Sequence, residues 1–390
     1  MVTAGFEEGG FSPASLRRRG SVKWRRYPED VLALWVAEMD FPAPPPVQAA
    51  VVDAVARQEY GYPVSDRESD LPAAVAAWEE ERYGWRVDPA RVHVLPDVLK
   101  GVELAVERYS PTDSAVILIT PAYMPFFDVP RVTRRPSIEV PTLVEDGVRR
   151  LDIAGIDAAF ARGGGTVVLC HPYNPVGRSF SADELTSLCE VVDRHGGRVV
   201  SDEVHAPLTY AGDRHVPYAS ISPVAAGHTL TLVSASKAWN LPGLKCAQAI
   251  VSSDVDEERW RSLPPLKTHG ASTLGIRANV AAFREGGAWL DDAVAFLDGN
   301  RRLLADLLAE HLPGVRYTVP EATYLAWLDC RALDLPVEAS EFFLTRARVA
   351  TNPGPAFGTD GAGHVRLNFA TSREILERAV AAMGAVVSRR

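Results

Sequence analysis

The residues best suited to chemistry lie in one short segment, Ser234 to Lys245, which reads Ser-Ala-Ser-Lys-Ala-Trp-Asn-Leu-Pro-Gly-Leu-Lys. It follows the apolar run Leu230 to Val233 and places Lys237 among small residues, with hydroxyl groups before it and a second lysine after it. An aldehyde cofactor that carries a phosphate needs an amine to form an imine, with hydroxyl donors and a positive charge for the phosphate. The segment therefore predicts that Lys237 binds pyridoxal phosphate, against the alternative of a turn that faces solvent.

Two further apolar runs also end in polar groups. The sequence Ser-Asp-Glu follows the run Arg198 to Val200, so Asp202 stands at the C-terminal end of a predicted strand, where open α/β sheets bind ligands. A carboxylate there would keep a pyridinium nitrogen protonated, although an N-cap aspartate is the alternative. Asn174 follows the run Thr166 to Cys170, and its amide can donate to a ring oxygen unless the segment is an ordinary turn. Together, the three strand ends favour a cofactor site.

Composition excludes several other classes of protein. The chain has 390 residues, 47% of them hydrophobic and 23% charged, which is enough for a large core and two domains. A net charge of -9 argues against a nucleic-acid surface. The four cysteines are widely spaced, so we expect reduced core thiols and no metal site. The chain lacks an apolar stretch long enough for a membrane span or a secretory signal, so a cytoplasmic location is expected.

Apolar runs alternate with amphipathic stretches along the middle of the chain. This pattern is typical of a mostly parallel sheet with helices on both faces. One of these helices is predicted from Ser181 to His195, where Ser181 and Glu184 have the spacing of a capping box. The predicted strands are Val92–Leu95, Ser114–Thr120, Thr166–Cys170, Arg198–Val200, Leu230–Val233 and Ala247–Val251.

The pattern changes near Gly287 and predicts a second, smaller α/β domain. A long helix is expected from Gly287 to His311, followed by further strands and helices. We therefore predict a large domain over residues 46–286 and a small, discontinuous domain formed by residues 1–45 and 287–390. The later elements expected in the small domain are the apolar run Tyr324–Leu328, a helix near Ala339–Ala347, the strand His364–Phe369 and a final helix from Ser372.

The order of these motifs resembles the fold type I pyridoxal-phosphate enzymes of the class I/II aminotransferase superfamily. The shared features are Asn-Pro, then Ser-Asp-Glu, then Ser-x-Ser-Lys-x-x-Asn-x-x-Gly-Leu-Lys. The N-terminal segments resemble the MalY/PatB branch of cystathionine β-lyases and related carbon–sulfur lyases. These segments are Ser21-Val-Lys-Trp24, Leu34-Trp-Val-Ala-Glu-Met-Asp-Phe41, Pro44-Pro-Pro-Val47 and Tyr60-Gly-Tyr-Pro63. The resemblance implies a seven-stranded, mostly parallel sheet flanked by helices, with a smaller α/β domain.

For the cofactor, the resemblance implies that Lys237 forms the imine, Asp202 pairs with the pyridine nitrogen and Asn174 donates to the ring oxygen. Tyr123 would stack on the ring, although its position after a strand is also typical of a core aromatic residue. The phosphate would be bound by the hydroxyls of Ser234 and Ser236, the Lys245 ammonium, the backbone amides of Val98 and Leu99 at a helix N-terminus, and Tyr62 of a neighbouring subunit.

For the substrate, the resemblance implies that Arg366 binds the carboxylate through two parallel hydrogen bonds. The alternative for Arg366 is a strand residue on the surface. Ala37 and Asn174 would complete the substrate site. Because Tyr62 would reach the phosphate of another subunit, the resemblance also implies a homodimer with shared active sites.

Two positions depart from the family pattern. Asp97 stands where the phosphate-binding turn usually has glycine, and its charge would repel the phosphate unless it points away or Lys100 offsets it. Glu38 replaces the more usual aspartate, and we expect it to reshape the substrate entrance.

Three functions stay open at this point. The N-terminal motifs favour β-elimination, in which cystathionine gives homocysteine, pyruvate and ammonia, with desulfhydration of cysteine as a related reaction. Lys237, Asp202 and Arg366 would equally begin an aminotransferase reaction, because fold does not fix the reaction. The third hypothesis is regulation through contact with a protein partner, since some members that resemble this chain bind a transcriptional activator.

Overall fold

The computed structural model describes residues 6, 11–66, 68–212 and 214–389. Residues 1–5, 7–10 and 390 of the predicted small domain, and residues 67 and 213 of the predicted large domain, lie outside the described residues.

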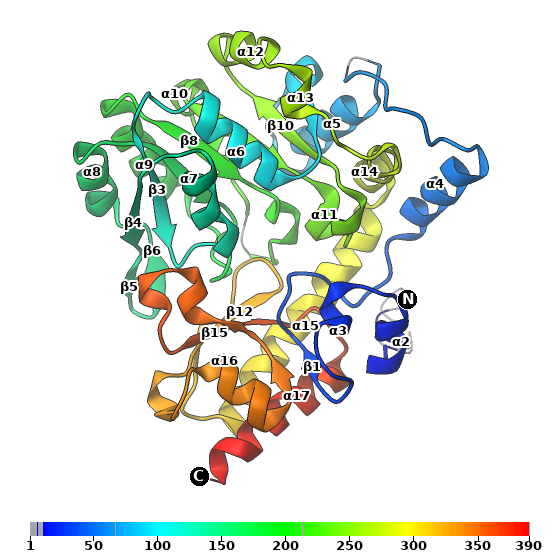
Figure 1. Cartoon of the computed structure of the whole chain (residues 1–390), viewed down its shortest axis with the longest axis vertical. Coiled ribbons are helices and arrows are strands. Elements are labelled where there is room, and N and C mark those ends of the chain that lie inside the picture. Colours follow the sequence, from blue (N-terminus) through cyan, green and yellow to red (C-terminus); the bar gives the residue numbers. More distant parts are fainter. Residues whose placement is uncertain (1–5, 7–10, 67, 213, 390) are drawn as a thin grey trace.

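A seven-stranded sheet with the order β2-β10-β9-β8-β7-β3-β4 lies in the upper part of the molecule as drawn in Figure 1. Only β10 runs antiparallel to its neighbours β2 and β9 within this sheet, which confirms the predicted fold. The strand β4 was absent from the apolar runs because its side chains are mostly exposed or half-buried. The strands are β2 (Val92–Leu95), β3 (Ala115–Thr120), β4 (Ser137–Pro141), β7 (Gly164–Cys170), β8 (Arg198–Asp202), β9 (Thr229–Val233) and β10 (Ala247–Val251).

Helices flank this sheet. Helix α6 packs on β2, β8, β9 and β10, while α8 packs on β3, β4 and β7. Helix α9 begins after Ser181, whose side chain forms the predicted capping box with Glu184. The helices of this part are α4 (Pro45–Ala56), α5 (Leu71–Tyr83), α6 (Val98–Arg108), α7 (Asp128–Val132), α8 (Ile153–Ala161), α9 (Ala182–Arg194), α10 (Pro223–Gly227), α11 (Ala235–Ala238), α12 (Asp254–Arg261), α13 (Pro265–Thr268) and α14 (Thr273–Glu285).

A four-stranded sheet with the order β11-β12-β15-β14 forms the C-terminal part. Its strands are β11 (Arg316–Tyr317), β12 (Leu325–Asp329), β14 (Asn352–Pro353) and β15 (His364–Asn368), and its helices are α15 (Gly287–His311), α16 (Ala339–Phe342) and α17 (Arg373–Ser388). The predicted helix near 339–347 continues beyond α16 as one π-helical turn, Phe343–Ala347. A separate hairpin pairs β5 (Leu143–Glu145) with β6 (Val148–Arg150).

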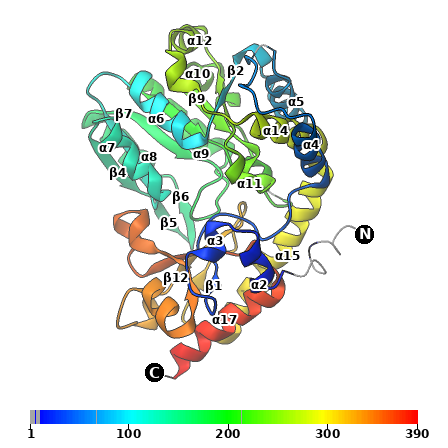
Figure 2. The ribbon, with the colours of Figure 1, turned by 45° about the vertical axis from the view of Figure 1, so that its right-hand side comes forward.

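The N-terminal segment lies beside this C-terminal part, as Figure 2 shows for α2 (Pro13–Arg18), α3 (Val22–Arg25) and α17. Strand β1 (Leu32–Ala33) pairs in parallel with β13 (Val349–Ala350), more than three hundred residues later in the chain. These contacts favour the predicted discontinuous small domain, whose limits stay a prediction.

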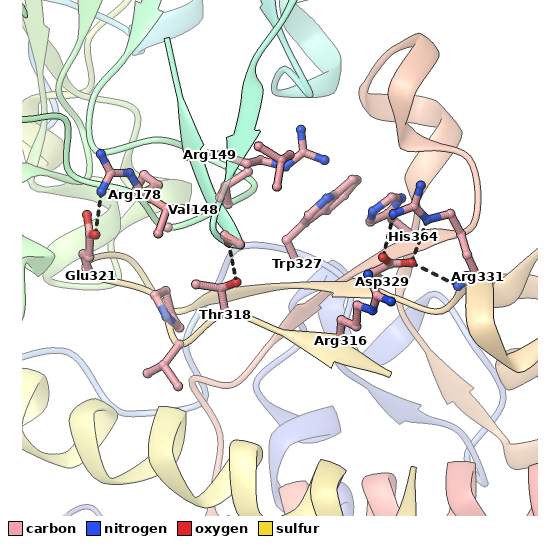
Figure 3. Close-up of a pocket in the computed structure, with 16 residues that line it drawn as sticks. Val148, Arg149, Arg178, Arg316, Thr318, Glu321, Trp327, Asp329, Arg331 and His364 are labelled. Atoms are coloured by element: carbon pink, nitrogen blue, oxygen red, sulfur yellow. Dashed lines mark hydrogen bonds and ion pairs between the residues drawn. The ribbon is translucent and has the colours of Figure 1, made fainter. Parts of the chain in front are cut away.

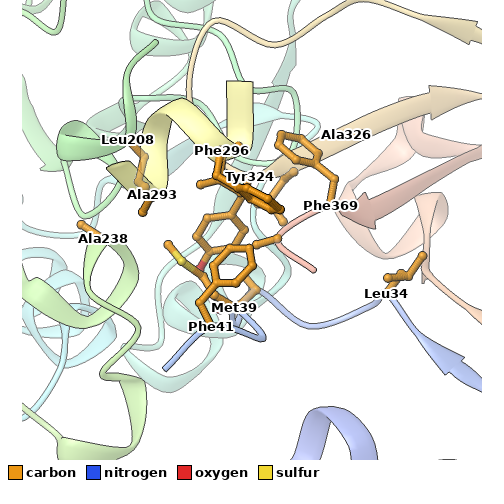
Figure 4. Packing of buried hydrophobic residues seen from close by; sticks show 14 of the residues in the cluster. Leu34, Met39, Phe41, Leu208, Ala238, Ala293, Phe296, Tyr324, Ala326 and Phe369 are labelled. Carbon is orange, nitrogen blue, oxygen red and sulfur yellow. Dashed lines mark hydrogen bonds between the residues drawn. The ribbon is translucent and has the colours of Figure 1, made fainter. Parts of the chain in front are cut away.

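After β1, the chain contacts both β15 and the segment that follows α11, because Asn368 and Asn240 donate to its carbonyls. Met39 and Phe41 from this stretch pack with Phe296 of α15, Tyr324 and Phe369 in a buried cluster (Figure 4). The stretch is fixed by a buried ion pair as well, because Lys23 Nζ lies 2.9 Å from an oxygen of Asp40. The same oxygen accepts a hydrogen bond from Nε1 of Trp24 at 2.6 Å.

Replacing Asp40 with alanine is expected to destabilise the protein by about 3–5 kcal/mol, because it leaves the buried Lys23 ammonium without its counter-charge. Urea unfolding of both proteins measures this difference. The matched control is Asp291→Ala, which removes the exposed partner of Arg82 and is expected to cost less than about 1 kcal/mol. Equal losses in the two variants would contradict the assigned role of the buried pair.

Candidate active site

Three neighbouring strands of the large sheet deliver polar groups to one edge. Asp202 is the last residue of β8, and its register partners are Cys170 at the end of β7 and Leu232 in β9. Asn174 follows β7, and Lys237 lies in α11, directly after β9. The structure therefore brings together the three residues on which the sequence prediction depended, because parallel strands end at a common edge.

Lys237 is half-buried, and its Nζ donates to the carbonyl oxygen of Ala37 at 2.9 Å. Burial lowers the pKa of its amine to about 8, and the positive charge of Arg366 acts in the same direction. Asp202 and Glu38 partly oppose this decrease. A substantial fraction of the amine is therefore neutral near physiological pH, which suits a nucleophile or a general base.

Asp202 is buried, and one carboxylate oxygen accepts a hydrogen bond from the backbone N–H of Val204 at 3.2 Å. Burial raises the pKa of this carboxyl to about 7, with Lys237 acting in the opposite direction. The carboxyl has no ion pair with any described residue, although buried carboxylates are usually paired. A protonated pyridine nitrogen would supply the missing positive charge, so Asp202 fits the cofactor.

Arg366 lies in β15 and is also buried without an anionic partner among the described residues. Its guanidinium donates to three neutral oxygens, those of Asn174 (3.0 Å), Asn352 (2.6 Å) and the Trp35 carbonyl (3.1 Å). Its Nε has no partner, and burial lowers the pKa of the group to about 10. A substrate carboxylate would supply the missing negative charge. Because Asn174 accepts from Arg366 through its oxygen, its amide N–H groups point elsewhere.

Tyr123 lies three residues after the end of β3 and is half-buried, and its ring makes a T-shaped contact with that of Phe126. Burial raises the pKa of its phenol, while Arg366 lowers it and Asp202 raises it. Tyr123 therefore lies within electrostatic reach of both groups, as a ring-stacking residue would need to.

The predicted phosphate ligands have partners of their own. The Ser234 hydroxyl donates to the carbonyl of Cys246 at 2.7 Å and accepts from the backbone N–H of Ser236 at 3.0 Å. The Lys245 ammonium lies 2.8 Å from Asp97. Ser234 and Lys245 would therefore have to share or exchange these partners to bind a phosphate.

Asp97 does not point away from the predicted phosphate site. It caps helix α6 by accepting from the backbone N–H of Lys100 at 2.9 Å, so Val98 and Leu99 form the first turn of that helix. The ammonium that offsets its charge is that of Lys245, whereas the ammonium of Lys100 pairs with Glu103 at 2.9 Å. Of the two conditions considered from the sequence, the Lys100 charge is therefore not the one that offsets Asp97, since Lys100 contributes a neutral backbone amide.

Tyr62 stands apart from this cluster, because its side chain is fully exposed on the loop before α5. Ser236 is half-buried, and Ala37 is buried beside Lys237.

Two site residues were not found from the sequence. His205 is buried with an unpartnered Nδ1, and burial together with the charges of Lys237 and Arg366 holds its pKa well below the usual range. Its position three residues after Asp202 was the available signal. Tyr324 donates its hydroxyl to Ala37 at 3.1 Å, and no sequence pattern marked it.

A separate pocket of about 180 Å³ lies between the β5–β6 hairpin and the small sheet (Figure 3). Its walls carry several arginines, but Arg178 is paired with Glu321 at 2.6 Å and Arg331 with Asp329 at 2.7 Å. None of the predicted site residues lines this pocket. Its arginines are therefore largely neutralised and do not belong to the cluster at the strand ends.

Residues 29–383 match the model of the aminotransferase class I and II family, and the chain belongs to this family. A cystathionine β-lyase from Corynebacterium glutamicum is 38% identical, with 95% of this chain and 98% of the relative covered. The cystathionine β-lyase PatB from Bacillus subtilis is 32% identical, with 93% and 96% covered. A solved structure of a candidate pyridoxal-phosphate-dependent β-cystathionase from Corynebacterium diphtheriae is 42% identical, has a TM-score of 0.92, and is matched over 97% of this chain and 98% of that chain. The predicted family is thus confirmed.

Among the residues that the structure describes, no helix has the length and apolar character of a membrane span.

Replacing Asp202 with asparagine is expected to make the stability of the cofactor-free protein less sensitive to pH. A carboxyl with a raised pKa stabilises the fold below its unfolded value and loses this contribution as pH rises through the folded value, here about 7. The free energy of unfolding of the variant, relative to the wild type, should therefore increase by about 2–3 kcal/mol from about pH 5 to about pH 8. Urea titrations at both pH values measure it.

The matched control is Asp53→Asn, at an exposed position of α4. Its free energy of unfolding relative to the wild type should change by less than about 0.5 kcal/mol between the two pH values. If the free energy of unfolding of Asp202→Asn relative to the wild type is independent of pH, the raised pKa of Asp202 is contradicted.

Proposed function

We propose that this protein is a pyridoxal-phosphate-dependent carbon–sulfur lyase. It would act by β-elimination on a sulfur amino acid and convert cystathionine to homocysteine, pyruvate and ammonia. The observation that carries the proposal is the group of three buried or half-buried charges around one site: the Lys237 amine, the unpaired Asp202 carboxyl and the unpaired Arg366 guanidinium. The names of the relatives support this reaction over others of the family.

Bound pyridoxal phosphate supplies an electron sink for the charge that develops at Cα when an amino acid loses its Cα proton. The residues of the chain would divide the remaining work. Lys237 takes the Cα proton, since its lowered pKa makes a larger fraction of the amine neutral than in an ordinary lysine. Arg366 binds the substrate carboxylate, and Asp202 holds the ring nitrogen protonated. Expulsion of the thiolate at Cβ then completes the elimination, and the released aminoacrylate reacts with water to give pyruvate and ammonia.

The other roles rest on the resemblance and on positions in the fold. Tyr123 would stack on the ring, and Asn174 would donate to the ring oxygen and face the substrate beside Ala37. Ser234, Ser236 and Lys245 would bind the phosphate, together with the backbone amides of Val98 and Leu99 at the start of α6. Asp97 would share Lys245 with the phosphate, so this chain should bind its cofactor less tightly than a relative with glycine there.

An aminotransferase reaction is the second candidate, because the family takes its description from that activity. Lys237, Asp202 and Arg366 would begin it in the same way. The reactions separate later, when a keto acid is released in place of a thiol. Cysteine desulfhydration is the lyase reaction with a smaller leaving group. A regulatory role through a protein partner stays a prediction.

Incubation of the cofactor-loaded protein with L-cystathionine, without any keto acid, tests the proposal. We expect pyruvate and free thiol in equal amounts. Replacing Lys237 with alanine should lower the rate by at least about 10³-fold, because one amine serves as nucleophile and base. The matched control is Lys267→Ala, which removes a surface lysine paired with Glu107. Amino-group transfer to an added keto acid, without pyruvate from cystathionine, would make the protein an aminotransferase.

The proposal includes a cytoplasmic homodimer with shared active sites. The exposed Tyr62 side chain supports it, since that residue is free to reach another subunit.

Mixed dimers of Tyr62→Ala and Lys237→Ala test this arrangement. In a mixed dimer, one site receives an intact Lys237 from one subunit and an intact Tyr62 from the other. Co-expression in equal amounts should therefore restore about a quarter of the wild-type rate, since about half of the dimers are mixed and each has one intact site. Activity equal to the mean of the two separate variants, or a fully active monomer, would contradict shared sites.

A further inference from the structure

The stretch from Trp35 to Phe41 is held almost entirely by side chains from other parts of the chain. The carbonyl of Trp35 accepts from Arg366, and those of Val36 and Glu38 both accept from Asn368 at 2.7 Å. Lys23 also donates to Glu38, and Asn240 donates to Met39 and Phe41. Each of these carbonyls has a fixed donor, so the position of the stretch is set by β15, by α3 and by the segment that follows α11.

The carbonyl of Ala37 differs from its neighbours because its donors include the catalytic lysine. Lys237 Nζ donates to it at 2.9 Å and the Tyr324 hydroxyl at 3.1 Å. The phenol and the amine therefore meet at one oxygen atom. When Lys237 reacts with the cofactor, its hydrogen bond to this carbonyl is broken, and the hydrogen bond from Tyr324 still fixes the carbonyl.

Tyr324 is placed rigidly. It is buried among Met39, Phe41 and Phe296, as Figure 4 shows, and its own carbonyl accepts from the backbone N–H of Phe369 at 3.0 Å. The preceding residue, Thr323, is buried and has a φ of 68°, which β-branched residues rarely adopt. Strain of this kind persists where the surroundings fix a conformation and is concentrated at functional sites.

We propose that Tyr324 is a positioning residue for Lys237: its hydroxyl occupies and fixes the Ala37 carbonyl, and so limits how tightly that oxygen holds the lysine amine. This inference rests on the proposed function, in which Lys237 must leave the carbonyl to react. A carbonyl that already accepts from a phenol is a weaker acceptor for a second donor, and the charged ammonium depends on that acceptor more than the neutral amine does.

Removal of the phenol hydroxyl should therefore stabilise the ammonium and raise the pKa of Lys237. The other groups that act on this pKa come from several elements: Asp202 from β8 and Glu38 from the N-terminal stretch raise it, and Arg366 from β15 lowers it. The neighbouring His205, whose own pKa is lowered by Lys237, completes this set. Tyr324 itself contacts His205 through its ring and acts on Arg366. Replacing it with phenylalanine keeps the ring and all of these residues and removes the hydroxyl.

The test is reductive methylation of Lys237 with formaldehyde and cyanoborohydride, which supplies the hydride, in the full-length, cofactor-free protein. Mass spectrometry of the peptide follows the reaction across pH. In Tyr324→Phe, we expect the pKa of Lys237 to rise by about half a unit to one unit, the scale of one hydrogen bond. In the cofactor-loaded enzyme, the acid limb of the plot of kcat against pH should move to higher pH. KM should change less than kcat.

The matched control is Tyr109→Phe, because Tyr109 is also buried and its hydroxyl donates to a backbone carbonyl, that of Asp256 in α12. An unchanged pKa of Lys237 in Tyr324→Phe would overturn the inference, as would an equal rise in Tyr109→Phe. If Tyr324→Phe does not fold, Tyr324→Met fills the space without a hydroxyl and is subject to the same criteria.

The methylation experiment needs neither cofactor nor turnover. A shifted pKa in a protein that yields no pyruvate would therefore refute the proposed function alone, and an unshifted pKa in an active lyase would refute the inference alone.

Discussion

The site depends on the stretch between Trp35 and Phe41, whose backbone carbonyls join the small sheet to the segment around α11. Arg366 of the small sheet donates to Trp35, and Lys237 beyond the large sheet donates to Ala37, two residues further along. The stretch therefore sets the separation of the residue that would bind the substrate carboxylate and the residue that would carry out the chemistry. Carbonyl oxygens can accept from both cations without adding charge, so the cations keep their affinity for anionic or electrophilic ligands.

The same region contains charges that the fold does not neutralise. Asp202 and Arg366 are buried, and within the described residues neither has an ion pair. Such groups destabilise a folded protein, because desolvation favours their neutral forms. The pKa values move accordingly, upward for Asp202 and downward for Arg366 and Lys237. A ligand with a protonated ring nitrogen and a carboxylate would offset both charges, so the energetic cost of burying these two groups unpaired favours binding.

In the predicted phosphate site, the sequence indicates the charged groups but not how they pair. The departure at Asp97 was recognised from the sequence, together with the repulsion that it implied. The partner that offsets its charge is Lys245, which is 148 residues away in the chain and was itself predicted to bind the phosphate. In the sequence the two positions carry separate signals, and only the fold brings them together as one ion pair. The strand β4 was missed for a different reason, since an exposed edge strand lacks the apolar pattern of the buried ones.

The sequence by itself determined the elements and the local chemistry. Hydrophobic periodicity and capping residues located the sheet and helices such as α9 and α15, and the motifs at three strand ends indicated Asn174, Asp202 and Lys237. These signals are local, because each strand and its terminal residue are continuous in the chain. The tertiary structure decided which distant groups meet them: Tyr324 and Lys237 on the Ala37 carbonyl, and Arg366 beside Asn174. Those contacts join segments about 200 residues or more apart, and they exist only once packing has fixed the two sheets against each other.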